Sequence, residues 1–104
     1  MDSVNTKKSI LETLQMNQKK LEDFGVNEIG LFGSYVRNEA TQDSDIDLLV
    51  NISREKKTFR NFMTLSYFLE ELFNRKVELV TKQSLSPYIG PHILNSVEYV
   101  AFTS

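Results

Sequence analysis

Two aspartates, Asp45 and Asp47, are the residues whose type and spacing most directly predict chemistry in this sequence. They lie two positions apart at the start of an expected strand over 45–52, and alternate residues of a strand share one face. Two carboxylates held this close repel each other unless a shared proton, a basic side chain or a bound cation compensates. No basic residue lies between Arg37 and Arg54. Because hard divalent cations such as Mg²⁺ prefer oxygen ligands, a metal is the most economical partner. The plainer alternative is that two acids at an exposed strand start discourage edge pairing.

A second candidate lies just before this pair, at Phe32-Gly33-Ser34. Here a short apolar run ends and a helix is expected to begin, an arrangement in which backbone amides can hold phosphate oxygens. Gly33 would allow a phosphate close to the backbone, and the Ser34 hydroxyl would add a donor. Taken alone, the same residues favour a plain turn with a capping serine.

Helices and strands alternate in the rest of the pattern, which predicts a small mixed fold with one pair of layers. Gly25 is expected to end the first helix in a left-handed conformation. The fourth helical segment is expected to be interrupted at Gly90-Pro91. The expected helices are 6–24, a short one from Ser34 or Tyr35, 58–74 and 84–95, and the expected strands are 29–32, 45–52, 76–81 and a short closing one in 97–102.

Length and composition narrow the class of protein. The chain has 104 residues, 40% of them hydrophobic, which is typical of one globular domain. A net charge of −2 argues against binding along a nucleic-acid backbone, and the absence of cysteine excludes disulfides and thiolate metal sites. The start of the chain has no apolar stretch like a signal peptide, and no run is long enough to span a membrane. We therefore expect a soluble, cytoplasmic protein.

The combination of the two candidates is more specific than either one alone. Gly33-Ser34, then ten residues, then Asp45-Ile46-Asp47 resembles the signature of the nucleotidyltransferase superfamily related to DNA polymerase beta. The longer stretches are most similar to the minimal nucleotidyltransferases of bacteria and archaea, which are often antitoxins encoded beside a helical HEPN toxin. The resemblance covers essentially the whole chain and implies a single domain over 1–104 with an α+β fold, in which helices flank a small mixed sheet. The stretches that carry it are Gly33-Ser34-Tyr35-Val36-Arg37, Ser44-Asp45-Ile46-Asp47-Leu48-Leu49-Val50 and Val77-Glu78-Leu79-Val80.

Two positions depart from the family's pattern. The family's third carboxylate is usually an aspartate on a later strand, and the matching residue here is Glu78, which keeps the charge on a side chain one methylene longer. Without the motif upstream, Glu78 would be read as an ordinary exposed strand residue. Asn38 stands where a glycine is common, and asparagine tolerates positive φ better than most residues.

The resemblance implies a two-metal nucleotidyl transfer. Asp45 and Asp47 would hold two Mg²⁺ ions, and Glu78 would complete the ion on the side of the attacking hydroxyl. Gly33 and Ser34 would position the β and γ phosphates of ATP, and Arg37 could reach the phosphates.

A chain this short leaves little room for an acceptor site of its own, so a partner protein is expected to supply one. The leading hypothesis is transfer of AMP from ATP to a hydroxyl, expected to be that of a tyrosine, on a cognate HEPN ribonuclease toxin in a hetero-oligomer. One alternative is a small-molecule nucleotidyltransferase of the aminoglycoside-modifying type, and another is a non-catalytic antitoxin that neutralises its partner by binding.

The remaining candidates are less specific. The cations Arg54, Lys56, Lys57 and Arg60 could guide a triphosphate, dock an acidic partner or simply be solvated. Tyr35 and Tyr88 are expected to pack into the fold, Tyr99 to lie near an edge, and His92 to have no catalytic role.

Overall fold

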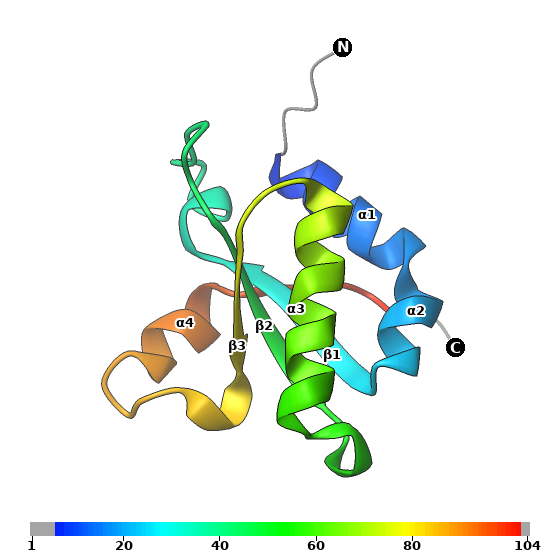
Figure 1. The fold of residues 1–104 in the computed structure, drawn as a ribbon. Coiled ribbons are helices and arrows are strands. Elements are labelled where there is room, and N and C mark those ends of the chain that lie inside the picture. Colours follow the sequence, from blue (N-terminus) through cyan, green and yellow to red (C-terminus); the bar gives the residue numbers. More distant parts are fainter. Residues whose placement is uncertain (1–5, 103–104) are drawn as a thin grey trace.

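A four-stranded mixed sheet carries the acidic residues, with strand order β3-β2-β1-β4 in the computed structural model, which describes residues 6–102 (Figure 1). The central strand β2 (Ile46–Ile52) pairs antiparallel with β1 (Val26–Phe32) and parallel with β3 (Val77–Thr81), while β4 (Glu98–Tyr99) adds an antiparallel edge beside β1. This is the expected α+β class. Both ends of the predicted 1–104 domain lie outside the described residues. The first five residues, where the sequence shows no signal-peptide pattern, are among them.

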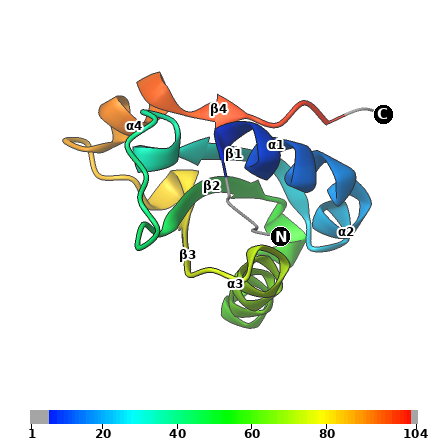
Figure 2. The ribbon, with the colours of Figure 1, turned by 90° about the horizontal axis from the view of Figure 1, so that it is seen from above.

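Three helices cover one side of the sheet, and the fourth lies on the other side (Figures 1 and 2). They are α1 (Lys7–Met16), α2 (Gln18–Asp23), α3 (Phe59–Phe73) and α4 (Gly90–Ser96). The core forms where the apolar stripes of the first three helices meet β1 and β2, because alternate strand residues point toward them. Buried members of this core include Ile10, Leu14, Leu21, Leu31, Leu48, Val50, Leu65 and Leu69. No helix in residues 6–102 has the length and apolar character needed to cross a membrane.

The first helical segment is interrupted, contrary to the expectation of one helix over 6–24. Thr6 caps α1 by accepting a hydrogen bond from the Ser9 backbone N–H at 3.1 Å. The Asn17 side chain then donates to the Thr13 carbonyl at 2.8 Å, and Asn17 leaves helical geometry. Gly25 follows with φ +85°, which confirms the expected left-handed exit.

The longest helix, α3, agrees with the expected range because both of its ends are capped. The Thr58 hydroxyl accepts from the Asn61 N–H at 3.1 Å, and Asn74 closes the helix at φ 51°. Phe59, the first residue of this helix, is 79% exposed.

Several other boundaries differ from the sequence-based expectation. The strand expected over 29–32 begins earlier, at Val26. The prediction missed this start because the first residues of the strand include polar side chains that hide the pattern. The helix expected from Ser34 or Tyr35 is a single 3₁₀ turn, η1 (Gly33–Tyr35).

The range predicted for the last helix, 84–95, was wrong. The 3₁₀ turn η3 (Lys82–Ser84) ends at the first of these residues, 85–89 are not helical, and α4 starts at Gly90, where a proline in the first turn needs no backbone donor. Tyr35 is buried as expected, whereas Tyr88 is 86% exposed and not packed; Tyr99 lies on the edge strand.

Candidate active site

The register of the sheet brings Asp47 and Glu78 side by side. They are direct partners across the parallel β2–β3 pair, while Phe32 is the partner of Asp47 on β1. Because β1 ends at Phe32, the turn that contains Gly33 and Ser34 begins next to the Asp47 carboxylate. Residues from three distant parts of the sequence therefore meet at one end of the sheet.

Asp47 is half-buried, and its surroundings favour the protonated form. Burial, the charges of Glu78 and Asp45, and a hydrogen bond between the Asp47 and Glu78 side chains together raise the pKa of Asp47 from 3.8 to about 6, against a smaller opposing effect of Arg37. The raised pKa shows that the neighbouring carboxylates disfavour the charged form of Asp47, and Arg37 compensates for only part of this effect.

Asp45 raises the pKa of Asp47 through its charge. It precedes Ile46, the first residue of β2, and is half-buried. Its effect on the pKa of Asp47 shows that the two carboxylates are within electrostatic reach.

Gly33 is required where the turn meets the acidic pair. Its φ is +80°, a conformation that L side chains rarely adopt, and a Cβ built on it would lie 2.1 Å from Oδ2 of Asp47. The residue at this position therefore has to be glycine for Asp47 to keep its place. In this structure, it is the Asp47 carboxylate that lies against the glycine.

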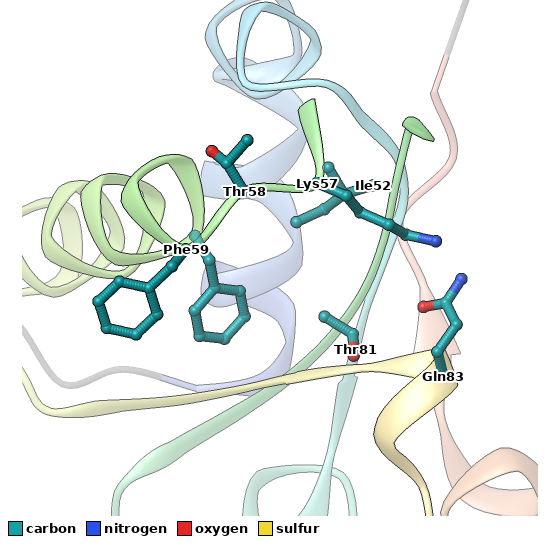
Figure 3. A pocket seen from close by; sticks show the side chains of 7 residues that line it. Ile52, Lys57, Thr58, Phe59, Thr81 and Gln83 are labelled. Atoms are coloured by element: carbon teal, nitrogen blue, oxygen red, sulfur yellow. The ribbon is translucent and has the colours of Figure 1, made fainter. Parts of the chain in front are cut away.

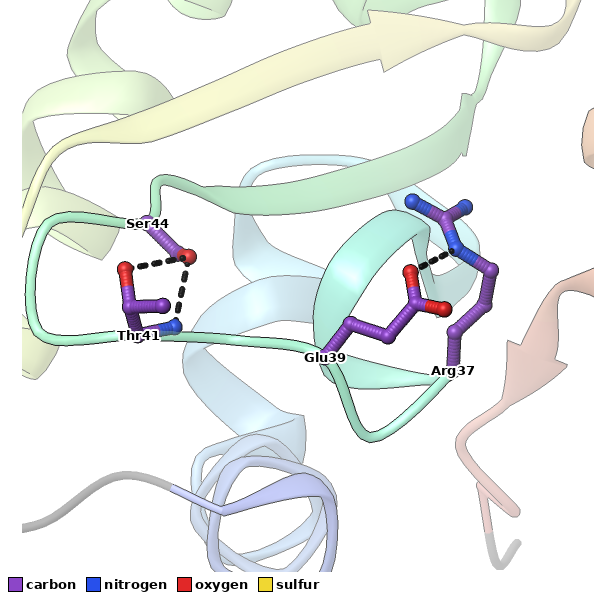
Figure 4. Close-up of polar contacts among 4 residues, drawn as sticks. All are labelled: Arg37, Glu39, Thr41 and Ser44. Atoms are coloured by element: carbon purple, nitrogen blue, oxygen red, sulfur yellow. Dashed lines mark hydrogen bonds and ion pairs between the residues drawn. The ribbon is translucent and has the colours of Figure 1, made fainter.

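Ser34 and Arg37 lie on the turn and on the loop that follows it. The Ser34 hydroxyl makes no hydrogen bond to any of residues 6–102, whereas its carbonyl accepts from the Glu39 N–H at 2.9 Å. The Arg37 side chain forms an exposed ion pair with Glu39, with 2.9 Å between Nε and Oε1 (Figure 4). The hydroxyl is thus available to a ligand, while the guanidinium has a partner that a ligand would have to displace. Asn38 adopts φ 62°, so asparagine does accommodate the turn.

Arg75 is a positioning residue that the sequence reasoning missed. From the connection between α3 and β3, its Nη1 donates to the Gln42 carbonyl and, at 3.2 Å, to the Ser44 carbonyl. The Ser44 side chain closes the same loop by bonding to Thr41 (Figure 4). Arg75 therefore fixes the loop that ends at Asp45. No local pattern could reveal this contact, because more than 30 residues separate the partners.

The oxygen ligands at this end of the sheet fit a divalent cation in type and charge. Asp47 and Glu78 offer carboxylate oxygens whose repulsion a cation would relieve, and Asp45 adds a third negative charge nearby. Within the part of the chain described, however, no three His, Cys, Asp or Glu side chains are gathered closely enough to hold an ion together. The fit therefore depends on the Asp47–Glu78 pair.

The cations Arg54, Lys56, Lys57 and Arg60 lie at the opposite end of β2, in and after the 3₁₀ turn η2 (Arg54–Lys56) (Figure 1). Five residues of extended strand, from Asp47 to Ile52, correspond to about 17 Å. The cluster is therefore not part of the acidic site.

Comparisons with known proteins identify the family of this chain. The family model of the nucleotidyltransferase domain matches residues 8–100. The protein adenylyltransferase MntA of Thermococcus cleftensis is 45% identical over 96 residues, which cover 91% of this chain and 96% of that protein.

Solved structures show the same arrangement of sheet and helices. One described as a minimal nucleotidyltransferase superposes with a TM-score of 0.80 at 26% identity, covering 93% of this chain and 98% of that chain. A complex of tri-AMPylated Shewanella oneidensis HEPN toxin with an MNT antitoxin matches with a TM-score of 0.58 at 22% identity, over 86% of this chain and 72% of that chain. The expected fold is confirmed: the mixed sheet with its helices is that of a minimal nucleotidyltransferase.

Proposed function

Because this chain belongs to the nucleotidyltransferase domain family, we propose that it transfers AMP from ATP to a hydroxyl of a partner protein. The observation that carries the proposal is the pairing of Asp47 with Glu78 against the Gly33 turn. The similarity to a protein adenylyltransferase over nearly the whole chain supports a protein as the acceptor.

Each group of residues at the site would have a separate role in the transfer. Asp45, Asp47 and Glu78 would hold two Mg²⁺ ions, which supply positive charge beside the phosphates and lower the pKa of the acceptor hydroxyl. A carboxyl group binds a metal in its ionised form, so Asp47, whose pKa is raised to about 6, has to lose its proton before it binds a cation.

The turn would bind the nucleotide. The free Ser34 hydroxyl would donate to a phosphate oxygen, and Arg37 would exchange Glu39 for the triphosphate. In the transfer, the acceptor oxygen bonds to the α-phosphorus, and the bond from that phosphorus to the bridging oxygen of pyrophosphate breaks. The hydroxyl proton passes to solvent.

For the acceptor, we propose a tyrosine of a cognate HEPN-class ribonuclease toxin, which would make this chain a cytoplasmic antitoxin in a hetero-oligomer. Support comes from the Shewanella oneidensis complex, in which an MNT antitoxin is bound to an AMPylated HEPN toxin.

The test is incubation with α-labelled ATP, Mg²⁺ and the HEPN-class protein encoded beside this chain. We expect label on the partner from the wild type and none from Asp47→Ala. Glu12→Ala removes an exposed acid of α1 and should transfer AMP as the wild type does. Wild-type protein that releases no pyrophosphate and labels no partner would rule the transfer out. Pyrophosphate release with an aminoglycoside and no protein acceptor would instead indicate a small-molecule nucleotidyltransferase.

Neutralisation by binding alone is the second candidate, favoured by the lack of a gathered three-carboxylate group in residues 6–102. Under this alternative, the double variant Asp45→Ala, Asp47→Ala would still protect cells that express the toxin. Under AMP transfer, that variant loses protection.

A further inference from the structure

A group of cations without ion-pair partners lies at the end of the sheet away from the carboxylates. Arg54, Lys56, Lys57 and Arg60 are exposed, and none of them forms an ion pair with a described residue. Four like charges within seven residues repel one another, with only Glu55 between them, in a chain whose net charge is −2. No ion pair among the described residues compensates for this repulsion.

The segment that carries these cations is held in place by hydrogen bonds. The Ser53 N–H donates to the Gly25 carbonyl at 2.7 Å, and the Asn61 amide donates to the carbonyls of Lys56 and Phe24 at 2.9 and 2.7 Å. A Cβ on Gly25 would lie only 2.4 Å from Cβ of Lys56, so the two segments are closely packed. The cations are therefore presented by a fixed turn, which lowers the entropy lost on binding.

A pocket opens beside this turn, between the start of α3 and the end of β3 (Figure 3). Its volume is about 480 Å³, and Phe59 lies on one side of it with Lys57 and Gln83 on the other. The lining residues are Ile52, Lys57, Thr58, Phe59, Phe62, Thr81 and Gln83, of which three are apolar and Lys57 is basic. Lys57 and the three cations near it in the sequence are called the basic rim below.

The exposed face of α3 extends this apolar surface. Phe59, Met63 and Tyr67 follow at intervals of four residues and so form one stripe along the helix. Phe59 and Tyr67 are 79% and 62% exposed. A pocket surrounded by aromatic and basic side chains is typical of a protein-binding surface rather than of a surface that contacts only solvent.

We propose that the pocket, the α3 stripe and the four cations form a docking surface for an acidic segment of a partner protein, with an aromatic or branched aliphatic side chain of that segment in the pocket. The basic rim selects the acidic partner by charge complementarity, and the apolar interior selects the anchor. Taking this partner to be the acceptor protein rests on the proposed function.

This surface is separate from the acidic site. Ile52 lines the pocket five residues after Asp47, and an odd spacing places the two side chains on opposite faces of β2. A partner held here leaves the carboxylates open to the nucleotide and to the acceptor hydroxyl.

The test compares matched variants for binding to the adjacent HEPN-class protein by biolayer interferometry. Lys57→Glu with Arg60→Glu reverses the rim, and Phe59→Ala removes the apolar wall. Folding is preserved because these side chains are exposed and acids are favoured at the N-terminus of a helix. Lys8→Glu with Lys19→Glu makes the same charge change on α1 and α2, and Met16→Ala removes an apolar side chain that is 85% exposed.

We expect the rim reversal to weaken binding at least about tenfold at about 50 mM NaCl, with a smaller effect at about 300 mM. Phe59→Ala should weaken it about fivefold or more. The controls and Asp47→Ala should bind within about twofold of wild type.

Equal losses in the controls, wild-type binding by the rim and pocket variants, or no binding by the wild type would overturn the docking surface. A change in self-association by light scattering, in place of partner binding, would also overturn it, because the occupant would then be a second copy. AMP transfer is measured separately. Loss of binding in the rim and pocket variants with no transfer by the wild type would refute only the proposed function, and transfer with unaffected binding would refute only the docking surface.

Discussion

Asp47→Asn should make the folded protein more stable at neutral pH while abolishing nucleotidyl transfer. Asparagine has nearly the same shape and keeps an oxygen and a donor for Glu78, but it carries no charge. In the wild type, partial burial and then the charges of Glu78 and Asp45 raise the pKa of Asp47 to about 6, so ionised Asp47 is held against the charges of its neighbours. Removing the charge removes the repulsion.

The size of the gain follows from the pKa. A change from 3.8 to about 6 corresponds to about 3 kcal/mol for a fully buried group. Asp47 is only half-buried, so solvent screening reduces the gain to about 1 to 1.5 kcal/mol. For a domain of this length, each 1 kcal/mol raises the melting temperature by about 4 to 8 °C.

The raised pKa of Asp47 determines how the stability of the folded protein changes with pH. The folded state binds the Asp47 proton more tightly than the unfolded state does, so the stability from this group is fully present below pH 3.8 and is lost as the pH rises through about 6. The wild type bears the whole penalty at pH 8, whereas the variant has no proton to lose there. Its advantage should therefore be greatest at pH 8 and vanish near pH 4.

Thermal unfolding followed by circular dichroism at pH 4 and pH 8 measures this difference. Asp43→Asn, at an exposed loop acid, is the control and should leave both melting temperatures unchanged. An equal gain at the two pH values, or a less stable variant at pH 8, would show that Asp47 is not held against its neighbours' charges.

Three further outcomes follow from the site. Gly33→Ala should destabilise the fold by about 2 kcal/mol or more in urea unfolding and abolish transfer, because the new Cβ would overlap Oδ2 of Asp47; wild-type stability would refute the close approach. Asn38→Gly should leave transfer unchanged, whereas Asn38→Val should cost about 1 to 2 kcal/mol at φ 62°, and equal stabilities by urea unfolding would contradict this. Arg75→Lys should lower kcat about tenfold at unchanged KM for ATP and speed hydrogen exchange in residues 41–46, since lysine is one bond shorter than the arginine Nη1 that donates to both carbonyls; a lower kcat without faster exchange would exclude the positioning role.

The elements that sequence predicted well have strong local signals. The start and end of α3 follow from Thr58 and Asn74, which are cap residues on either side of a long apolar stripe. The α1–α2 break depends instead on one hydrogen bond from Asn17 to Thr13, which competes with a pattern that continues through it. The length of β1 was underestimated because polar residues follow Val26 at its start and hide the strand pattern.

The candidate site was predictable as far as its residues share a motif. Gly33 and the two aspartates are linked by a fixed spacing, and Glu78 is placed beside Asp47 by a strand pairing that the motif implies. Arg75 was not predictable, because its role depends on tertiary contacts to carbonyl groups, which any sequence possesses.

Net charge conceals how the charges of this chain are arranged along β2. Asp45 and Asp47 stand at the start of the strand and the cations begin at Arg54 just past its end, so a net charge of −2 for the whole chain hides an acidic end and a basic end. Their separation of about 17 Å along the strand exceeds the screening length of about 8 Å at physiological salt. Each group therefore acts on its own surroundings. An acidic end suited to cations and a basic end suited to an acidic protein can work independently on a sheet this small because the strand between them is rigid and buried.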